Sequence, residues 1–164
     1  TGEVMGRGNS LEEAFIKSQV AAYQSEIKEG YVFIGVTDQD KQEMIPAAFE
    51  FQQAGRKILA TAGTFDVLKK AGVANIKKTS LDRKTAGNIF EYLERDEVAL
   101  IVNTTRSRKR SIDASHIRRV ALLHNLPYFT TVEGTLNLAR ALVATDSGKN
   151  LSYQPLPLPQ KIAS

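Results

Sequence analysis

Short apolar runs alternate with amphipathic runs along most of this chain, and this alternation constrains the fold more than any other feature. Residues 31–36 and 98–102 are almost continuously apolar, as strands buried on both faces of a sheet are. The segments between successive apolar runs are too long for hairpins, so the strands are expected to run parallel, each followed by a helix. The sequence therefore predicts an α/β domain whose parallel sheet is covered by helices on both faces.

Turn and capping residues set the expected boundaries of the elements. Ser10 can cap the first helix, and Gly55 and Gly72 are good helix stops. Ile34 and Ile101 are expected at the buried centre of the sheet. The expected strands are residues 31–36, 57–60, 73–78, 98–102 and 127–130. The expected helices are residues 11–27, 44–53, 65–70, 88–94, 112–124 and 132–144.

Composition places the chain among ordinary globular domains. It has 164 residues, which fits one domain, and it contains no cysteine, which excludes disulfides, thiolate catalysis and cysteine-based zinc sites. No stretch approaches the 18 or so apolar residues of a membrane span, and no signal peptide is recognisable, so a cytoplasmic protein is expected. The net charge of +4 and pI near 9.3 favour anionic partners without naming one.

Polar residues follow three of the expected strands, where an open parallel sheet binds its ligands. Thr61, Gly63 and Thr64 lie at the start of a helix, where backbone N–H groups and the helix dipole attract anions, and Lys41 can supply a counter-charge. Asn103-Thr104-Thr105 follows the clearest strand. These motifs predict a phosphate-binding site. The alternative is that Thr64 only caps its helix and that residues 103–105 only satisfy backbone groups at a strand end.

Catalytic signals are sparse. His116 and His124 lie on one helix and are more typical of structural histidines, and no HExxH, Walker A or Gly-x-Ser-x-Gly sequence is present. The basic run at residues 106–110, joined by Arg118 and Arg119, is expected to be a solvated loop or a face for an acidic partner. It lacks the interleaved aromatic residues of single-strand nucleic-acid binders, so nucleic acid is not the expected partner.

With these residues in place, the chain resembles the carbamoyl-phosphate synthase large subunit. Residues 1–6, Thr-Gly-Glu-Val-Met-Gly, look like the end of its second synthetase half. Later motifs look like its C-terminal allosteric domain, in order and with similar spacing over about residues 1–145. These motifs are Val32-Phe33-Ile34, Asp38-x-Asp40-Lys41, Thr61-x-Gly63-Thr64, Asn103-Thr104-Thr105, Ile117-Arg118-Arg119 and Tyr128-x-Thr130-Thr131.

The resemblance implies a methylglyoxal-synthase-like, three-layer α/β/α fold with a five-stranded parallel sheet in the order 3-2-1-4-5. It also implies one pocket for the nucleoside monophosphates UMP or IMP. The matching effector residues are Lys41, Thr61, Gly63, Thr64, Asn103 and Thr105.

Some positions depart from the family pattern. Gly35 stands where a serine is usual, and Lys77 and Lys78 both compete for the place of a usual lysine after the third strand. The ornithine contacts of the family fall on Tyr128 and Thr130, but Phe129 replaces the aspartate between them, which weakens the expectation of ornithine control.

The resemblance also divides the chain and names its partners. Residues 1–28 are expected to be a junction segment, residues 29–145 the regulatory domain and residues 146–164 a tail. The fragment is expected to be non-catalytic, with no cofactor or metal of its own. The parent is a ligase that makes carbamoyl phosphate from glutamine, bicarbonate and ATP, using Mg²⁺ or Mn²⁺ and K⁺. The expected partners are the effector, the synthetase halves and the glutaminase small subunit, with no membrane.

Two rival functions remain. A methylglyoxal synthase shares the implied fold, but it needs a carboxylate base, and Asp82 in the loop 79–85 is the candidate here. A nucleic-acid or protein interaction module would use the basic run.

Overall fold

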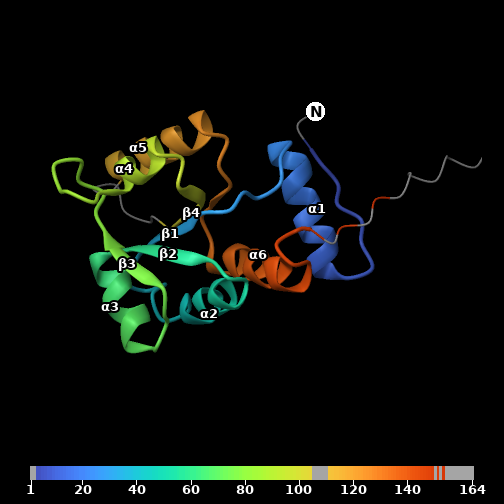
Figure 1. The fold of residues 1–164 in the computed structure, drawn as a ribbon, viewed down its shortest axis with the longest axis horizontal. Coiled ribbons are helices and arrows are strands. Elements are labelled where there is room, and N and C mark those ends of the chain that lie inside the picture. The colour runs from blue at the N-terminus through green and yellow to red at the C-terminus, as the bar shows by residue number, and fades with distance from the viewer. Residues whose placement is uncertain (1–2, 105–110, 150, 152, 154–164) are drawn as a thin grey trace, which may run out of the picture.

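A twisted sheet of five parallel strands forms the centre of the molecule (Figure 1). The computed structural model describes residues 3–104, 111–149, 151 and 153. The strand order is β3-β2-β1-β4-β5, which confirms the order that the resemblance implied. Ile34 and Ile101 are fully buried, as expected for the middle of such a sheet.

The elements alternate along the chain as predicted. The strands are β1 (Tyr31–Val36), β2 (Lys57–Thr61), β3 (Ile76–Thr79), β4 (Val98–Thr104) and β5 (Tyr128–Phe129). The helices are α1 (Leu11–Tyr23), α2 (Ile45–Gln53), α3 (Ala62–Lys70), α4 (Ile89–Glu94), α5 (Ser111–Leu123) and α6 (Val132–Ala144).

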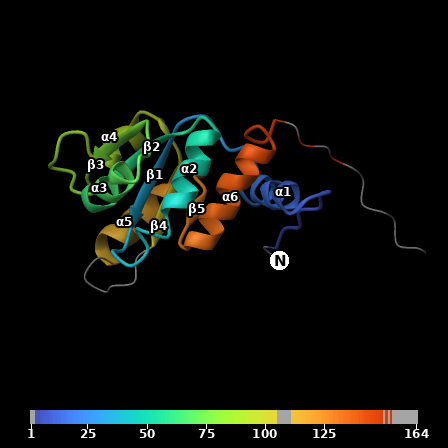
Figure 2. The same cartoon turned by 90° about the horizontal axis from the view of Figure 1, so that it is seen from below.

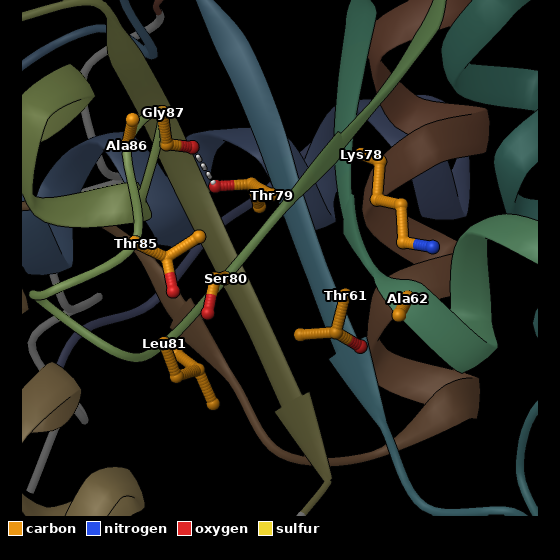
Figure 3. A pocket seen from close by; sticks show the side chains of 9 residues that line it. All are labelled: Thr61, Ala62, Lys78, Thr79, Ser80, Leu81, Thr85, Ala86 and Gly87. Carbon is orange, nitrogen blue, oxygen red and sulfur yellow. Dashed lines mark hydrogen bonds between the residues drawn. The ribbon is translucent and has the colours of Figure 1, made fainter.

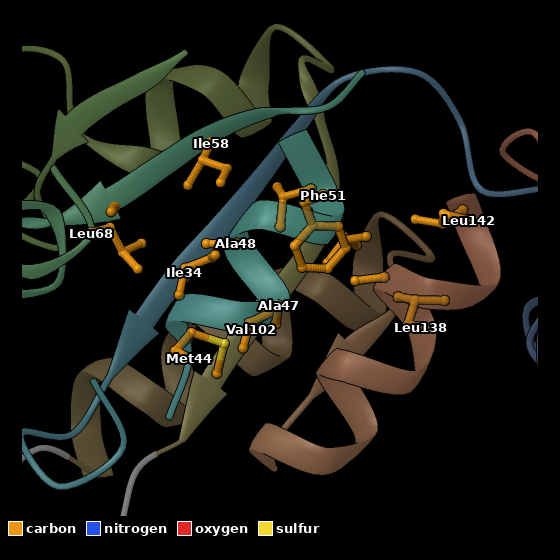
Figure 4. Packing of buried hydrophobic residues seen from close by; sticks show 14 of the residues in the cluster. Ile34, Met44, Ala47, Ala48, Phe51, Ile58, Leu68, Val102, Leu138 and Leu142 are labelled. Carbon is orange, nitrogen blue, oxygen red and sulfur yellow. The ribbon is translucent and has the colours of Figure 1, made fainter. Parts of the chain in front are cut away.

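Two apolar cores cover the two faces of the sheet. In β1 and β2, strand residues with even numbers, such as Ile34 and Ile58, pack with α2, α3 and α6 (Figure 4). Odd-numbered residues, such as Phe33 and Leu59, pack with α4 and α5. Helix α1 adds Ile16 to the first core and lies beside α6 (Figure 2). The sheet is therefore the middle of three layers, and both of its faces are shielded from water.

The first helix is shorter than predicted. Ser10 caps it, accepting a hydrogen bond from the Glu13 N–H, but α1 ends at Tyr23 rather than at residue 27 because Gln24 adopts a left-handed conformation with φ of 52°. The guanidinium of Arg56 holds the connection that follows, donating from Nη1 to the Lys28 carbonyl at 2.7 Å. Arg56 is 2% exposed, and this burial lowers its pKa.

The third helix begins earlier than predicted, at Ala62 instead of residue 65. Thr61 keeps an extended backbone as the last residue of β2, and the chain turns directly into the helix after it. The interpretation of Thr64 as the N-cap is therefore wrong, since Thr64 lies inside α3. The strand expected at residues 98–102 is longer than predicted, because Asn103 and Thr104 still belong to β4 and pair with Gly35 and Val36.

Candidate functional site

Several predicted site residues lie in one row across the carboxyl ends of the strands. Thr61 pairs with Thr79 on one side of the sheet centre, and Gly35 pairs with Asn103 on the other. All four have odd numbers and share the face of Phe33 and Leu59, which α4 and α5 cover. A Cβ atom at Gly35 would lie 3.3 Å from Thr61 Cγ2, so Gly35 and Thr61 lie next to each other on adjacent strands. The fold thus places Thr61, Gly35 and Asn103 on neighbouring strands at the same edge of the sheet.

Lys41 reaches the N-terminus of α3. A Cβ atom added to Gly63 would lie 2.4 Å from Lys41 Nζ, so the ammonium group occupies the space that any larger residue at 63 would need. Lys41 Nζ also donates to Asp38 Oδ1 at 2.5 Å. The N-cap Thr61 makes no side-chain capping bond, and the first turn of a helix presents N–H groups without intrahelical partners. A cation and backbone donors therefore converge at this point.

Thr64 is a buried residue that holds the start of α3 against the end of β1. Its side chain is fully buried, and its hydroxyl accepts hydrogen bonds from Val36 N at 3.5 Å and from Thr61 Oγ1 at 3.2 Å. Thr64 therefore ties α3 to the end of β1 and orients Thr61, the more exposed of the two threonines.

A cavity of about 590 Å³ opens beside Thr61 (Figure 3). Helix α3 and the segment after β3 form its walls. It is lined by Thr61, Ala62, Lys78, Thr79, Ser80, Leu81, Thr85, Ala86 and Gly87. Figure 3 shows the Lys78 side chain on the side of Ala62, at the beginning of α3.

The two candidate lysines of β3 point to different faces of the sheet. Lys78 lines the cavity, whereas Lys77 Nζ lies 5.5 Å from the centre of the Tyr31 ring, on the sheet face that α4 and α5 cover. Hydrogen bonding to Tyr31 raises the pKa of Lys77, together with the charge interaction between the two groups. This geometry selects Lys78 as the lysine able to meet a ligand in the cavity.

The loop that lines the cavity is fixed by hydrogen bonds. Thr79 Oγ1 donates to the Gly87 carbonyl at 2.8 Å, which closes the loop at its base. Asn88 caps α4, accepting from Phe90 N at 3.0 Å, and donates to the Thr85 carbonyl at 2.8 Å. Ser80, Leu81 and residues 85–87 were not predicted from the sequence to line a cavity. The Asn-x-x-Glu spacing at 88–91 is a helix-start signal that could have placed this loop.

A buried carboxylate joins the ends of β1 and β4. Asp40 is 4% exposed, and its Oδ2 accepts hydrogen bonds from Thr37 Oγ1 at 2.8 Å and from Thr104 Oγ1 at 2.5 Å. Thr37 N donates to Thr104 Oγ1 at 3.2 Å. Asp40 directly precedes Lys41, so this network fixes the backbone from which Lys41 extends. Asp40 was not predicted to have a site role.

The remaining predicted residues lie at the β4–β5 edge. Asn103 is 6% exposed and donates from Nδ2 to the Tyr128 hydroxyl at 3.0 Å. Thr130 is exposed just beyond β5, and Phe129 packs partly buried against the first core. Thr105 lies outside the described residues, as does the basic run at 106–110.

The residues proposed for rival chemistry lie elsewhere. Asp82 is exposed and lines a second cavity of about 350 Å³ with Leu81, Arg83, Phe90 and His116. His124 is exposed directly after α5. Over the described ranges, no cluster of three or more His, Asp or Glu side chains could hold a metal ion. No helix in the described part of the chain is long and apolar enough to cross a membrane.

The domain has three α/β/α layers, and a cavity with Lys78 in its wall lies at the carboxyl ends of the strands, the edge where open parallel sheets bind their ligands. The sequence model of the MGS-like domain matches residues 43–130, and the chain belongs to this family.

Named relatives of the chain are carbamoyl phosphate synthase large chains. The C-terminal section of the Aquifex aeolicus protein is 33% identical over 160 residues, which cover 95% of this chain and 30% of that protein. The Methanothrix thermoacetophila large chain is 37% identical over 142 residues, which cover 87% of this chain and 13% of that protein. The chain thus spans less than a third of the length of these relatives. A crystal structure of ForH superposes with a TM-score of 0.51 over 73% of this chain and 83% of its own, at 15% identity, and supports the fold alone.

Proposed function

We propose that this chain is the effector-binding regulatory domain of a carbamoyl phosphate synthase large chain, and that its effector is a nucleoside monophosphate such as UMP or IMP. The observation that carries the proposal is the cavity beside the N-terminus of α3, with Lys78 in its wall and Lys41 over the neighbouring Gly63. Cations and helix N–H groups are the partners that a phosphate prefers. A volume of about 590 Å³ is of the size that small-molecule ligands use.

The lining of the cavity favours binding over catalysis. Among its described lining residues there is no Asp, Glu or His, and Lys78 is the titratable side chain that faces a ligand there. Asp82, the candidate base for a methylglyoxal synthase reaction, is exposed and lines the second cavity instead. The domain is therefore proposed to act on chemistry performed by other parts of the protein.

In the full-length protein those other parts would be the synthetase halves, which use ATP with Mg²⁺ or Mn²⁺ and K⁺, and the glutaminase small subunit. They would make carbamoyl phosphate from glutamine, bicarbonate and ATP, for pyrimidine and arginine synthesis. The relatives support this proposal by their names, and the domain would influence the reaction through its contacts with the synthetase halves.

Calorimetric titration of the chain with UMP, IMP, inorganic phosphate and N-acetylglutamate tests the effector. Saturable binding of UMP or IMP is expected, with phosphate competing for the same site. Lack of binding by both nucleotides would refute the proposal. A duplex or single-stranded oligonucleotide that binds more tightly than either, with a steep loss of affinity at high salt, would favour the nucleic-acid alternative.

The regulatory role is tested in the full-length enzyme. Deleting the sequence from Gly30 onward should leave carbamoyl phosphate synthesis measurable and abolish its response to UMP and IMP. A truncated enzyme that still responds to either nucleotide would contradict the assigned role, even if the isolated chain bound that nucleotide.

A further inference from the structure

The second cavity, of about 350 Å³, holds two basic side chains next to each other. Arg83 Nη2 lies 3.3 Å from His116 Nε2. A guanidinium group has N–H donors and no acceptor, so His116 Nε2 must accept in this contact. The His116 ring therefore carries its proton on Nδ1 and is neutral in this arrangement.

One aromatic ring holds both groups in place. The guanidinium carbon of Arg83 lies 4.0 Å from the centre of the Phe90 ring, and the centre of the His116 ring lies 5.1 Å from it. Phe90 is buried in the core that α4 and α5 form with the sheet. The backbone below Arg83 is also fixed, because its carbonyl accepts from Asn88 Nδ2 at 3.3 Å. The two basic groups are thus positioned before a ligand arrives, which lowers the entropy cost of binding.

The guanidinium of Arg83 keeps donors available for a ligand. Its described carboxylate partner is Glu94, whose Oε1 lies 3.9 Å from Arg83 Nη1, beyond the distance of a hydrogen bond. Both side chains are more than half exposed, so this ion pair contributes little. The contact with His116 uses one end of a fork that has several N–H groups. A carboxylate, with two oxygens in one plane, is a group that such a fork binds well.

The charges around the cavity favour a ligand with a single negative charge. Asp82 lines the cavity together with Arg83, and its carboxylate would repel a second negative charge on the ligand. The effector cavity differs, because its described lining contains Lys78 and no acidic side chain, which suits a phosphate dianion. A volume of about 350 Å³ is at the small end of the range that organic ligands use.

We propose that the second cavity is a separate binding site, which takes the carboxylate group of a small monocarboxylate between Arg83 and His116. An oxygen that enters there faces His116 Nε2, and this atom can donate to it only after it gains a proton. Binding should therefore be accompanied by proton uptake at His116 and should strengthen as the pH falls.

Charged groups on three elements influence that proton. In the loop, Arg83 opposes it and Asp82 favours it. Glu94 of α4, which lies near Arg83, also favours it. Arg119, one turn further along α5, opposes it. A bound carboxylate adds a negative charge next to the ring and shifts this balance towards the protonated form.

NMR titration of the intact chain with benzoate tests the site, because the chain has two histidines and His124 serves as an internal reference. Benzoate should move the ring signals of His116 towards those of a protonated ring and leave those of His124 unchanged. Its affinity should rise as the pH falls. Benzamide, which has the same shape without the charge, should cause neither change.

Arg83→Gln should weaken benzoate binding by about tenfold or more, as expected for the loss of a charge-assisted hydrogen bond. Arg95→Gln is the matched control, since Arg95 also lies over an aromatic ring, that of Tyr92 at 5.0 Å, but does not line the cavity. This control should bind benzoate as the wild type does.

A second titration in the presence of excess UMP distinguishes the two cavities, and benzoate should still bind. Displacement of benzoate by UMP would overturn the proposal, because benzoate would then occupy the effector cavity. Signals of His116 that do not respond to benzoate would also overturn it, as would equal binding of benzamide or an affinity that Arg83→Gln leaves unchanged.

Discussion

Replacing Gly63 by alanine should lower the affinity for UMP and change the free energy of unfolding little. The new Cβ atom would lie 2.4 Å from Lys41 Nζ and 3.3 Å from its Cε, so the lysine tip must move away. The backbone of Gly63 has no left-handed φ that would strain an alanine. The substitution therefore displaces one ammonium group and leaves the helix intact.

The expected change is small for the free energy of unfolding and large for the affinity. Alanine in a helix is favoured over glycine by roughly 0.5–1 kcal/mol. The displaced Lys41 loses its ion pair with Asp38, whose side chain is 78% exposed, and such pairs contribute about 0–1 kcal/mol. Stability should change little. A hydrogen bond from a charged group to phosphate contributes about 1.5–3 kcal/mol, so UMP affinity should fall by at least about tenfold.

Urea unfolding and calorimetric titration with UMP measure the two effects on the same protein. Lys41→Met supplies the second arm of a double-mutant cycle, because it removes the ammonium group without filling the space at residue 63. If the alanine acts through Lys41, it should cost little affinity in the Lys41→Met background. An equal loss in both backgrounds would refute this reasoning and indicate that the methyl group itself excludes the phosphate.

Two further pairs of substitutions, one at the lysines of β3 and one at Asp40, test the site. Lys78→Ala should weaken UMP binding by about tenfold, as expected for the loss of a charge-assisted hydrogen bond, while Lys77→Ala should not, because Lys77 lies over Tyr31. Titration of both variants checks this, and equal losses would contradict the assignment of Lys78. Asp40→Ala removes the acceptor of two hydroxyl bonds and should lower the free energy of unfolding in urea by about 2–5 kcal/mol. Asp40→Asn can keep an oxygen where both hydroxyl groups donate, so it should recover part of the lost free energy of unfolding. An alanine variant as stable as wild type would show that these hydrogen bonds do not stabilise the segment 37–41.

Apolar runs and their periodicity predicted much of the fold, because the residues in these runs are the ones that the fold buries. The strand at 31–36 and the helix at 132–144 have the predicted bounds. The error at the end of the first helix occurs where contacts between residues far apart in sequence determine the structure. The first helix ends early, and the segment after it is held by Arg56, whose contact with Lys28 is 28 positions away in sequence. No local pattern contains that contact.

The geometry of the candidate site was harder to predict from the sequence than the strands and helices. The choice between Lys77 and Lys78 depends on the register of β3, since a shift by one residue moves every side chain to the opposite face of a sheet. A short strand with two adjacent lysines gives no periodicity to fix that register. The shape of the loop at 79–88 could not be predicted either, because it depends on hydrogen bonds from Thr79 and Asn88 to backbone carbonyls.

Gly35 has a consequence for how this domain can evolve. A Cβ atom there would lie 2.9 Å from Phe33 Cζ and 3.1 Å from Cε1, and the Phe33 ring is fully buried. The serine that is usual at this position in the resembling family cannot be restored by a single substitution without shifting a core ring. Residues 33 and 35 are therefore expected to be epistatic: among related sequences, a side chain at 35 should accompany a smaller or differently placed residue at 33.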